Sequence, residues 1–69
     1  MERNFGKRLK ELRTERKLTI RDMGNILEMS HQTYVKYEQN LVEPPLVKLH
    51  KLADYFKVTT DYLLGRTDY

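Results

Sequence analysis

The apolar residues of this chain recur every three or four positions, and no stretch alternates apolar with polar residues at every second position. This spacing follows the turn of an α-helix, which holds about 3.6 residues, whereas a half-buried strand repeats every second residue. Residues that favour helix ends separate the periodic stretches. The pattern predicts an all-α domain with five short helices, over residues 4–16, 19–27, 30–39, 45–56 and 60–64.

Hydroxyl side chains precede three of the predicted helices, as expected of residues whose oxygen accepts a hydrogen bond from a free backbone N–H. They are Thr19, Ser30 and Thr59. Thr19 lies three residues before Asp22, which is the spacing of a capping box with Asp in place of Glu. Ser30 lies only three residues after Leu27, so the second and third helices are predicted to be joined by a very short turn.

The one long connection lies before the fourth helix. Asn40 suits the left-handed conformation that ends many helices, and Pro45 is expected in the first turn of the next helix. That helix is predicted to bury a stripe of residues: Leu46, Leu49, Leu52, Ala53 and Phe56. Gly65 is expected to end the last helix. Residues 65–69 are expected either to form a loose tail or to belong to an interface that the sequence does not reveal.

Composition and charge narrow the class of protein. The chain has 69 residues, enough for one small core, and no cysteine, so neither a disulfide nor a thiolate metal site can stabilise it. No stretch approaches the roughly 18 apolar residues of a membrane span, and we expect a cytoplasmic protein. Residues 1–21 hold eight basic and three acidic side chains, whereas the remainder holds five and seven. Clustered positive charge favours a partner such as nucleic acid, although ordinary solvated helices also carry it.

The residues that could support catalysis or hold a cofactor are few and scattered. Ser30 is the only serine, and the adjacent His31 projects about 100° away around the same helix, so the two cannot act as nucleophile and base. His50 has no second metal ligand at helical spacing, and the three glycines are too far apart to form a phosphate-binding loop. We therefore predict no enzyme activity, metal, cofactor or small-molecule ligand.

The third predicted helix has a polar outer face. It presents His31, Gln32, Thr33 and Lys36, whereas Tyr34 and Tyr37 point inward. Gln can pair with adenine, and Lys with guanine, in the major groove of DNA. Solvated helices also carry Gln and Lys, so these residue types alone leave both interpretations open.

Two charged residues fall on the inward stripes of the first and third helices. Arg13 lies four residues after Leu9, and Glu38 lies four residues after Tyr34. Charges on buried stripes need partners, so we predict an ion pair between Arg13 and Glu38.

Six short motifs occur in an order and at a spacing that resemble a known family. They are Phe5-Gly6-Lys7-Arg8-Leu9-Lys10-Glu11-Leu12-Arg13, Leu18-Thr19, Ser30-His31-Gln32-Thr33-Tyr34, Tyr37-Glu38, Glu43-Pro44 and Val58-Thr59-Thr60-Asp61-Tyr62-Leu63-Leu64. Over residues 5–64 the chain resembles the lambda-repressor-like, or XRE-type, helix-turn-helix proteins of phages and bacteria. The resemblance implies a compact five-helix DNA-binding domain over residues 1–69, in which helices two and three form the helix-turn-helix and helix three enters the major groove.

The resemblance also implies roles for individual residues. Base edges would be read by His31, Gln32 and Lys36, and phosphates would be contacted by Thr19, Thr33 and Gln39. The amino end of the third helix, at Ser30, would offer N–H groups to a phosphate. Ile20 stands where the family usually has Gln, so that phosphate contact is either missing or made by Arg21. The same resemblance pairs Arg13 with Glu38.

Several positions depart from the family pattern. Lys17 and Glu28 stand where glycines are common, so either the turns are reshaped or these residues adopt a positive φ at a cost of roughly 1 kcal/mol each. Gly24 replaces the usual alanine, which would let the third helix pack closely. The loop over residues 41–43 is not basic, and the two prolines after it lack N–H donors, so phosphate binding at this edge is doubtful.

Two functions from different classes follow. The first is a sequence-specific double-stranded DNA-binding regulator, a repressor that binds a palindromic operator as a homodimer, cytoplasmic and nucleoid-associated in a bacterium or phage host. Arg8 and Arg21 would then bind all DNA sequences alike. The alternative is a helical protein-interaction module of the antitoxin or adaptor type. The apolar residues that would form a dimer interface, or merely cap a small core, are Leu41, Val42, Tyr62, Leu64 and Tyr69.

Overall fold

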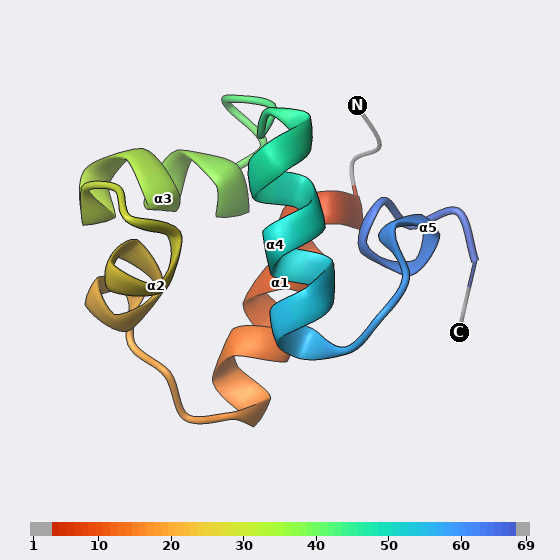
Figure 1. Cartoon of the computed structure of the whole chain (residues 1–69), viewed down its shortest axis with the longest axis horizontal. Helices are drawn as coiled ribbons and strands as arrows, with labels where there is room; N and C mark the ends of the chain where they lie inside the picture. Colours follow the sequence, from red (N-terminus) through yellow and green to blue (C-terminus); the bar gives the residue numbers. More distant parts are fainter. Residues whose placement is uncertain (1–3, 68–69) are drawn as a thin grey trace.

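The helices predicted from periodicity are present in the computed structural model, which describes residues 4–67. They are α1 (Asn4–Glu15), α2 (Ile20–Leu27), α3 (His31–Glu38), α4 (Leu46–Phe56) and α5 (Thr60–Leu63). Every helix end lies within one residue of its predicted position. In Figure 1, α2 and α3 lie together on the left, α4 stands in the centre in front of α1, and α5 lies on the right. None of the helices in residues 4–67 has the length and apolar character needed to cross a lipid bilayer.

One apolar core is shared by all five helices. Its buried members are Phe5, Leu9, Leu12, Met23, Leu27, Tyr34, Tyr37, Leu49, Leu52, Ala53, Phe56 and Leu63. Fully burying one large apolar side chain stabilises a fold by about 1.5–3 kcal/mol, so this cluster supplies the main favourable contribution. The core fixes α3 by one face only and leaves its opposite face outside.

The predicted hydroxyl caps are in place. The Oγ1 of Thr19 accepts the N–H of Asp22 at 3.0 Å, and the Asp22 carboxylate accepts the N–H of Thr19 at 2.9 Å. This reciprocal pair is the predicted capping box. Ser30 and Thr59 cap α3 and α5 in the same way, each by accepting a backbone N–H three residues on.

Within residues 4–67, four residues other than glycine adopt the left-handed conformation. They are Lys17, Glu28, Asn40 and Lys57, with φ between 57° and 59°. The sequence left open whether the turns at Lys17 and Glu28 are reshaped or whether these residues adopt a positive φ. The second alternative is correct. Asn40 is left-handed as expected, whereas Lys57, which ends α4, was not predicted.

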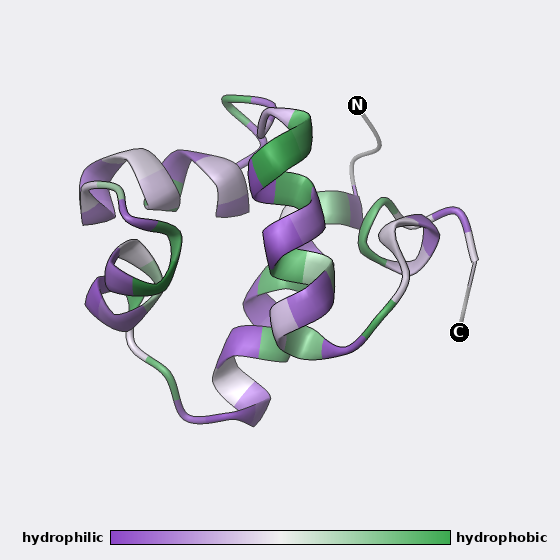
Figure 2. Cartoon of the chain, in the orientation of Figure 1, coloured by the Kyte–Doolittle hydropathy of each residue, from purple (hydrophilic) through white to green (hydrophobic). Residues whose placement is uncertain are grey.

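The beginning of α4 differs from the prediction. Leu46 was expected in the buried stripe, but its side chain is 72% exposed. It lies one turn before Leu49, the first buried residue of the helix, so this turn extends beyond the core. Figure 2 shows the apolar colour of this turn at the top of α4. Pro45 is not in the first turn either. It is the N-cap, with an extended ψ of 160°, and its carbonyl oxygen accepts the N–H of Leu49.

The chain after α5 begins with a hydrogen-bonded turn. The N–H of Gly65 donates to the carbonyl oxygen of Tyr62, and the N–H of Arg66 donates to that of Asp61. A Cβ at Gly65 would lie 2.6 Å from the Cβ of Asn4, so this turn packs on the start of α1. The backbone of residues 65 and 66 is therefore hydrogen-bonded to α5. The last two residues of the expected loose tail lie outside the described residues.

Candidate nucleic-acid interface

α2 and α3 form a tight helix-turn-helix. Glu28 takes the left-handed conformation after α2, and the N–H of Met29 then donates to the carbonyl oxygen of Gly24 at 2.9 Å. A Cβ at Gly24 would lie 2.8 Å from the carbonyl oxygen of Met29 and 3.3 Å from the backbone nitrogen of His31. The missing side chain at position 24 therefore lets α3 begin close against α2, as predicted.

The other end of α3 is equally close to α1. A Cβ at Gly6 would lie 2.2 Å from the carbonyl oxygen of Glu38, and the N–H of Gly6 donates to the Oδ1 of Asn40 at 3.0 Å. Sequence reasoning did not identify this contact. The available signal was the spacing of Gly6 and Arg13, which lie seven residues apart and so face the same side of α1.

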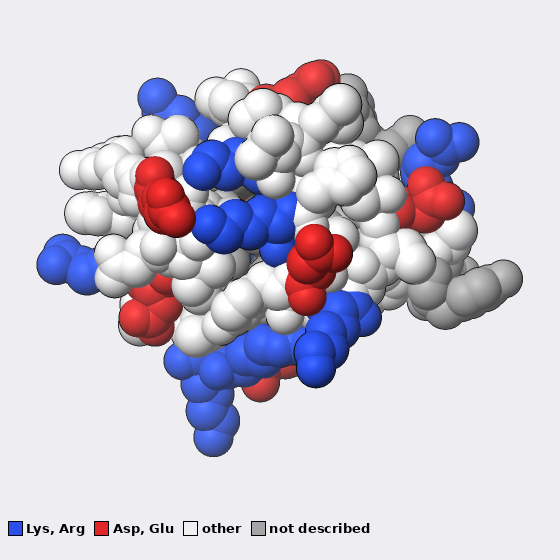
Figure 3. Space-filling model, in the orientation of Figure 1, with Lys and Arg blue, Asp and Glu red and all other residues white. Residues whose placement is uncertain are grey.

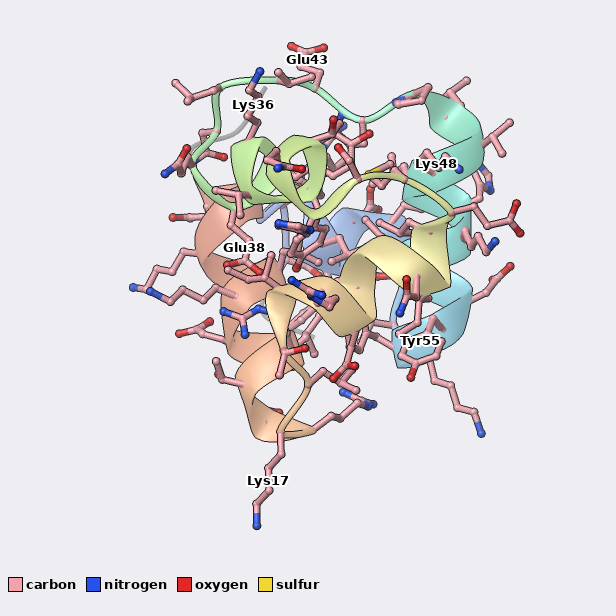
Figure 4. The ribbon with its side chains drawn as sticks, turned by 90° about the vertical axis from the view of Figure 1, so that its left-hand side faces the viewer. Lys17, Lys36, Glu38, Glu43, Lys48 and Tyr55 are labelled. Carbon is pink, nitrogen blue, oxygen red and sulfur yellow. The ribbon has the colours of Figure 1, made fainter. Side chains whose placement is uncertain are left out.

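An ion pair fixes α3 to α1 at this joint. The Nε of Arg13 donates to the Oε2 of Glu38 at 2.6 Å and Nη2 donates to Oε1 at 3.3 Å, while the two side chains are 11% and 8% exposed. Nη1 of Arg13 also donates to the carbonyl oxygen of Leu18 at 2.9 Å. The Tyr34 hydroxyl donates to the same Glu38 carboxylate. This network links α1, the turn before α2, and α3, and Figure 4 shows Glu38 between the α3 and α1 ribbons.

The network keeps its protonation state near neutral pH. The hydrogen bond to Glu38 raises the pKa of the Arg13 guanidinium, although burial opposes this shift. Burial, with the Glu38 hydrogen bond as a second cause, raises the pKa of the Tyr34 phenol. Arg13 therefore stays charged and Tyr34 stays a donor near neutral pH, so the hydrogen bonds of the inward face of α3 are kept.

The outward face of α3 carries the predicted base-reading residues. Two of them, Gln32 and Lys36, are exposed and lie one turn apart, and the exposed Gln39, which was predicted to contact a phosphate, continues the same stripe. His31, at the beginning of the helix against Gly24, is half-buried. Val35 is also half-buried, on the edge of this stripe, and was not proposed from the sequence. The signal in the sequence that could have identified Val35 is its position three residues after Gln32, which places it near the same face of the helix.

Four of the five predicted phosphate-contacting residues lie at the amino ends of α2 and α3, whereas the fifth, Gln39, is the C-cap of α3. Thr19, Arg21, Ser30 and Thr33 are all exposed. The hydroxyls of Ser30 and Thr33 lie 2.9 Å apart and bond to each other. Both capping oxygens already accept a backbone N–H, at Asp22 and at Thr33, so the amino end of each helix is preorganised.

Several basic side chains make contacts within the domain. The guanidinium of Arg8 lies 4.3 Å from the ring centre of Tyr62 in α5, and Arg16 donates to the carbonyl oxygen of Phe56 at the end of α4. The Lys48 ammonium donates to the carbonyl oxygen of Leu27 at the end of α2. Arg8 faces α5, which Figure 1 places away from α2 and α3. Its expected role in DNA binding is therefore not supported.

The remaining charge is unevenly distributed. Figure 3 shows Lys and Arg side chains gathered along the lower edge of one face, over the end of α1, whereas acidic groups are scattered. Residues 41–45 of the connection between α3 and α4 are apolar except for Glu43, and none of them is basic, as the sequence indicated. Within residues 4–67 no group of three or more His, Asp or Glu side chains is arranged to hold a metal ion.

Comparisons with known proteins agree with this geometry. The model of the helix-turn-helix domain family matches residues 6–68. The chain is 41% identical over 63 residues to the prophage-derived HTH-type transcriptional regulator YonR of Bacillus subtilis, covering 91% of this chain and 58% of that protein. It is 39% identical over 64 residues to the HTH-type transcriptional regulator YobD of the same organism, covering 93% and 57%.

A relative from another organism is more distant. The phage CTXphi transcriptional repressor RstR of Vibrio cholerae is 32% identical over 64 residues, which cover 93% of this chain and 58% of RstR. The chain thus spans a little over half the length of these curated relatives. The matching family model, the five helices and the tight α2–α3 turn together show that the chain belongs to the helix-turn-helix domain family, of the XRE-like type.

Proposed function

We propose that this chain is a sequence-specific double-stranded DNA-binding domain of a transcriptional regulator, and that it inserts α3 into the major groove. The observation that carries the proposal is the exposed stripe of Gln32, Lys36 and Gln39 on a helix whose opposite face is fixed by the Arg13–Glu38 pair. A rigid helix with free polar groups along one face suits the reading of base edges.

The base contacts come from four residues. Gln32 pairs with adenine, Lys36 with guanine, and His31 contacts the base pair nearest the amino end of α3. Val35 adds an apolar contact that favours a thymine methyl group. Together they read only a few base pairs, so one domain has limited specificity by itself.

The phosphate contacts come from the helix ends and flanks. Thr19 and Arg21 approach the backbone from α2, and Ser30, Thr33 and Gln39 approach it from α3. Free N–H groups at the amino end of α3 add a partial positive charge. These groups hold the domain on DNA without sequence preference.

We further propose that the chain acts as a homodimer on a palindromic operator and represses transcription by occupying it. Half-sites one helical turn apart place the two domains about 34 Å apart. The domain measures 28 Å along its longest axis, so two copies at this spacing are neighbours. The relative RstR is named as a repressor, which favours repression over activation. The site of action is the bacterial nucleoid, in the cytoplasm.

The experiment that tests this proposal is selection of bound duplexes from a random pool, followed by titration of the selected DNA at several salt concentrations. We expect a palindromic consensus and a log–log slope of roughly −0.9 for each phosphate contacted. Enrichment of duplexes without a consensus would show that the domain binds DNA without sequence preference.

The alternative is a helical module of the antitoxin or adaptor type that binds a protein with the same face. The acidic and apolar connection between α3 and α4 favours it, because a DNA-binding loop is usually basic. A binding constant that barely changes with salt, together with failure of duplex selection, would support this alternative instead.

A further inference from the structure

The two ends of α3 are held by different parts of the molecule. At the carboxyl end, the Glu38 carboxylate is bonded to Arg13 of α1. The amino end is joined to α2 by only three residues, and a Cβ at Gly24 of α2 would lie 3.3 Å from the backbone nitrogen of His31. The position of the amino end of α3 therefore depends on what holds the end of α2.

The carboxyl end of α2 needs partners that its own sequence does not fully supply. The last carbonyl groups of a helix have no N–H partner within the helix, and they carry a partial negative charge. The N–H groups of Glu28 and Met29 donate to two of these carbonyls, but α2 has no basic residue in its last turn. Because Glu28 adopts the left-handed conformation, the helix does not continue, and the Leu27 carbonyl needs a donor from another segment.

The first turn of α4 supplies that donor. Lys48 is half-buried there, and its ammonium donates to the carbonyl oxygen of Leu27. Figure 4 shows Lys48 on α4 beside the connection between α2 and α3. Hydrogen bonds with an ionised donor are roughly twice as strong as neutral ones, and this cation also faces the negative end of the α2 dipole. Lys48 therefore joins the beginning of α4 to the end of α2.

The backbone that carries Lys48 is itself held by the core. The adjacent Leu49 is buried, as is Leu52 one turn further along α4. The N–H of Leu49 also donates to the carbonyl oxygen of Pro45, which fixes the first turn of the helix. The ammonium of Lys48 therefore reaches α2 from a backbone whose position is set independently of α2 and α3.

A second lysine of α4 makes a weaker contact with the same turn. The Lys51 ammonium lies 3.4 Å from the Glu28 carboxylate, and these two side chains are 40% and 78% exposed. Exposed ion pairs contribute little to stability, because water screens them. Lys51 lies three residues after Lys48 and so on the same side of α4, which makes it a control that carries the same charge.

We propose that Lys48 is a positioning residue for the reading of DNA. By binding the Leu27 carbonyl it sets the end of α2 and, through the short turn, the amino end of α3. This inference rests on the proposed insertion of α3 into the major groove. Its effect is uneven along α3, because α1 holds Glu38 at the other end independently. A shift of the amino end displaces Gln32 more than Lys36, which lies one turn nearer to Glu38.

Discrimination between bases tests the inference. The base pairs that depend on Gln32 and on Lys36 are first identified with the alanine variants of these residues. The parent, Lys48→Met and the control Lys51→Met are then titrated on the selected duplex and on duplexes altered at those base pairs. Lys48→Met keeps the apolar stem of the side chain and removes its donor.

The expected result is a loss at one base pair only. A good pairing with a base gives about 5- to 150-fold discrimination, so Lys48→Met should lose about 5-fold or more at the base pair that depends on Gln32. It should keep the parent discrimination at the base pair that depends on Lys36. Lys51→Met should keep the parent discrimination at both.

Two further measurements separate positioning from a purely structural role. Lys48→Arg, which restores a charged donor, should recover the discrimination lost in Lys48→Met. The NMR chemical shift of the Leu27 carbonyl carbon, measured without DNA, should change in Lys48→Met and stay at the parent value in Lys51→Met. Circular dichroism melts set a titration temperature at which every variant is folded, so a loss of stability alone does not alter the measured discrimination.

Three results would overturn the inference and leave the proposed function intact. Unchanged discrimination in Lys48→Met would mean that Lys48 does not position α3. Equal weakening on all duplexes, with a salt slope smaller by about 0.9, would make Lys48 a phosphate contact instead. An unchanged Leu27 carbonyl shift would mean that the hydrogen bond is not formed. A parent that selects no consensus would overturn the proposed function and this inference together.

Discussion

The two faces of α3 differ in how their polar atoms are used. On the inward face, the Tyr34 hydroxyl and the Glu38 carboxylate are bonded to each other, and Glu38 is also bonded to Arg13. On the outward face, Gln32 and Lys36 are exposed. The difference teaches that one helix can be fixed in place and still have polar groups available for binding, because the contacts that position it and the proposed reading residues lie on opposite sides. Changes on the first face should alter stability, and changes on the second should alter DNA binding.

The largest expected effect is on the inward face. Arg13→Ala should lower the free energy of unfolding by about 3–5 kcal/mol, because it leaves the Glu38 carboxylate without its partner in a largely desolvated site. Urea denaturation followed by circular dichroism measures this loss. Arg21→Ala, which removes an exposed cation, is the control and should change stability by less than about 0.5 kcal/mol. An Arg13→Ala variant that unfolds with the parent would show that the pair does not hold α3.

The close approach of α1 to α3 predicts a second loss of stability. Gly6→Ala places a Cβ 2.2 Å from the carbonyl oxygen of Glu38, so the helices must separate, at a net cost of about 1–3 kcal/mol. In an open helix the same change is favourable by up to about 1 kcal/mol. Lys7→Ala, at the exposed neighbouring position, is the control. A Gly6→Ala variant as stable as the parent would mean that α1 and α3 can move apart at Gly6 without loss of stability.

Substitutions on the outward face of α3 should weaken DNA binding and leave stability unchanged. Gln32→Ala should cost about 1–3 kcal/mol of discrimination at one base position, because a paired amide is lost, while the denaturation midpoint stays unchanged. Gln39→Ala should weaken binding to all duplexes alike, since that residue is assigned to the backbone. Titration of duplexes that differ at single positions distinguishes the two. Equal discrimination by Gln32→Ala and the parent would mean that α3 reads DNA through other residues.

Much of the inward face was predictable from the sequence. Apolar spacing and hydroxyl caps are local features, and they placed the helices and Thr19 correctly. Arg13 and Glu38 were predicted to be partners because two charges on apolar stripes need each other. Gly6 was not recognised as a contact, since a close approach depends on how two distant segments meet. Leu46 was assigned to the core for a related reason, because periodicity gives the face of a residue but not where the neighbouring helix ends.

The candidate site was predictable in part. The sequence indicated the polar outer face of α3, because Gln32 and Lys36 lie one helical turn apart on the side opposite Tyr34 and Tyr37. It did not show that Arg8 stacks on Tyr62, because cations that satisfy aromatic rings or helix carbonyls have the same composition as cations that face a ligand. Total charge therefore overestimated the number of basic groups available to DNA.

The left-handed residues at the helix ends predict a smaller effect on stability, which depends on local backbone conformation rather than on tertiary packing. Lys17 and Lys57 hold φ of 57° at the ends of α1 and α4, a conformation that costs an L-residue roughly 1–2 kcal/mol and glycine much less. Lys17→Gly and Lys57→Gly should each stabilise the domain by up to about 1 kcal/mol after the added flexibility of the unfolded chain is subtracted. Lys10→Gly, inside α1, should destabilise it by about 1 kcal/mol. Chemical denaturation of the three variants measures these opposite signs.

The smallest expected effect is a pH dependence at the beginning of α2. The backbone N–H of Thr19, followed by its hydroxyl, lowers the pKa of the Asp22 carboxyl below its ordinary value of 3.8. A carboxyl whose folded pKa is depressed contributes stability that is fully present above the unfolded pKa, and this contribution disappears as the pH falls through the folded pKa. Thermal melts between pH 7 and pH 2 should therefore show a loss that begins below about pH 4, and Asp22→Asn should remove that component. Asp54→Asn controls for the loss of one negative charge. If Asp22→Asn keeps the full acid dependence, the capping box is not what links the beginning of α2 to pH, and that end of the helix is held by the core alone.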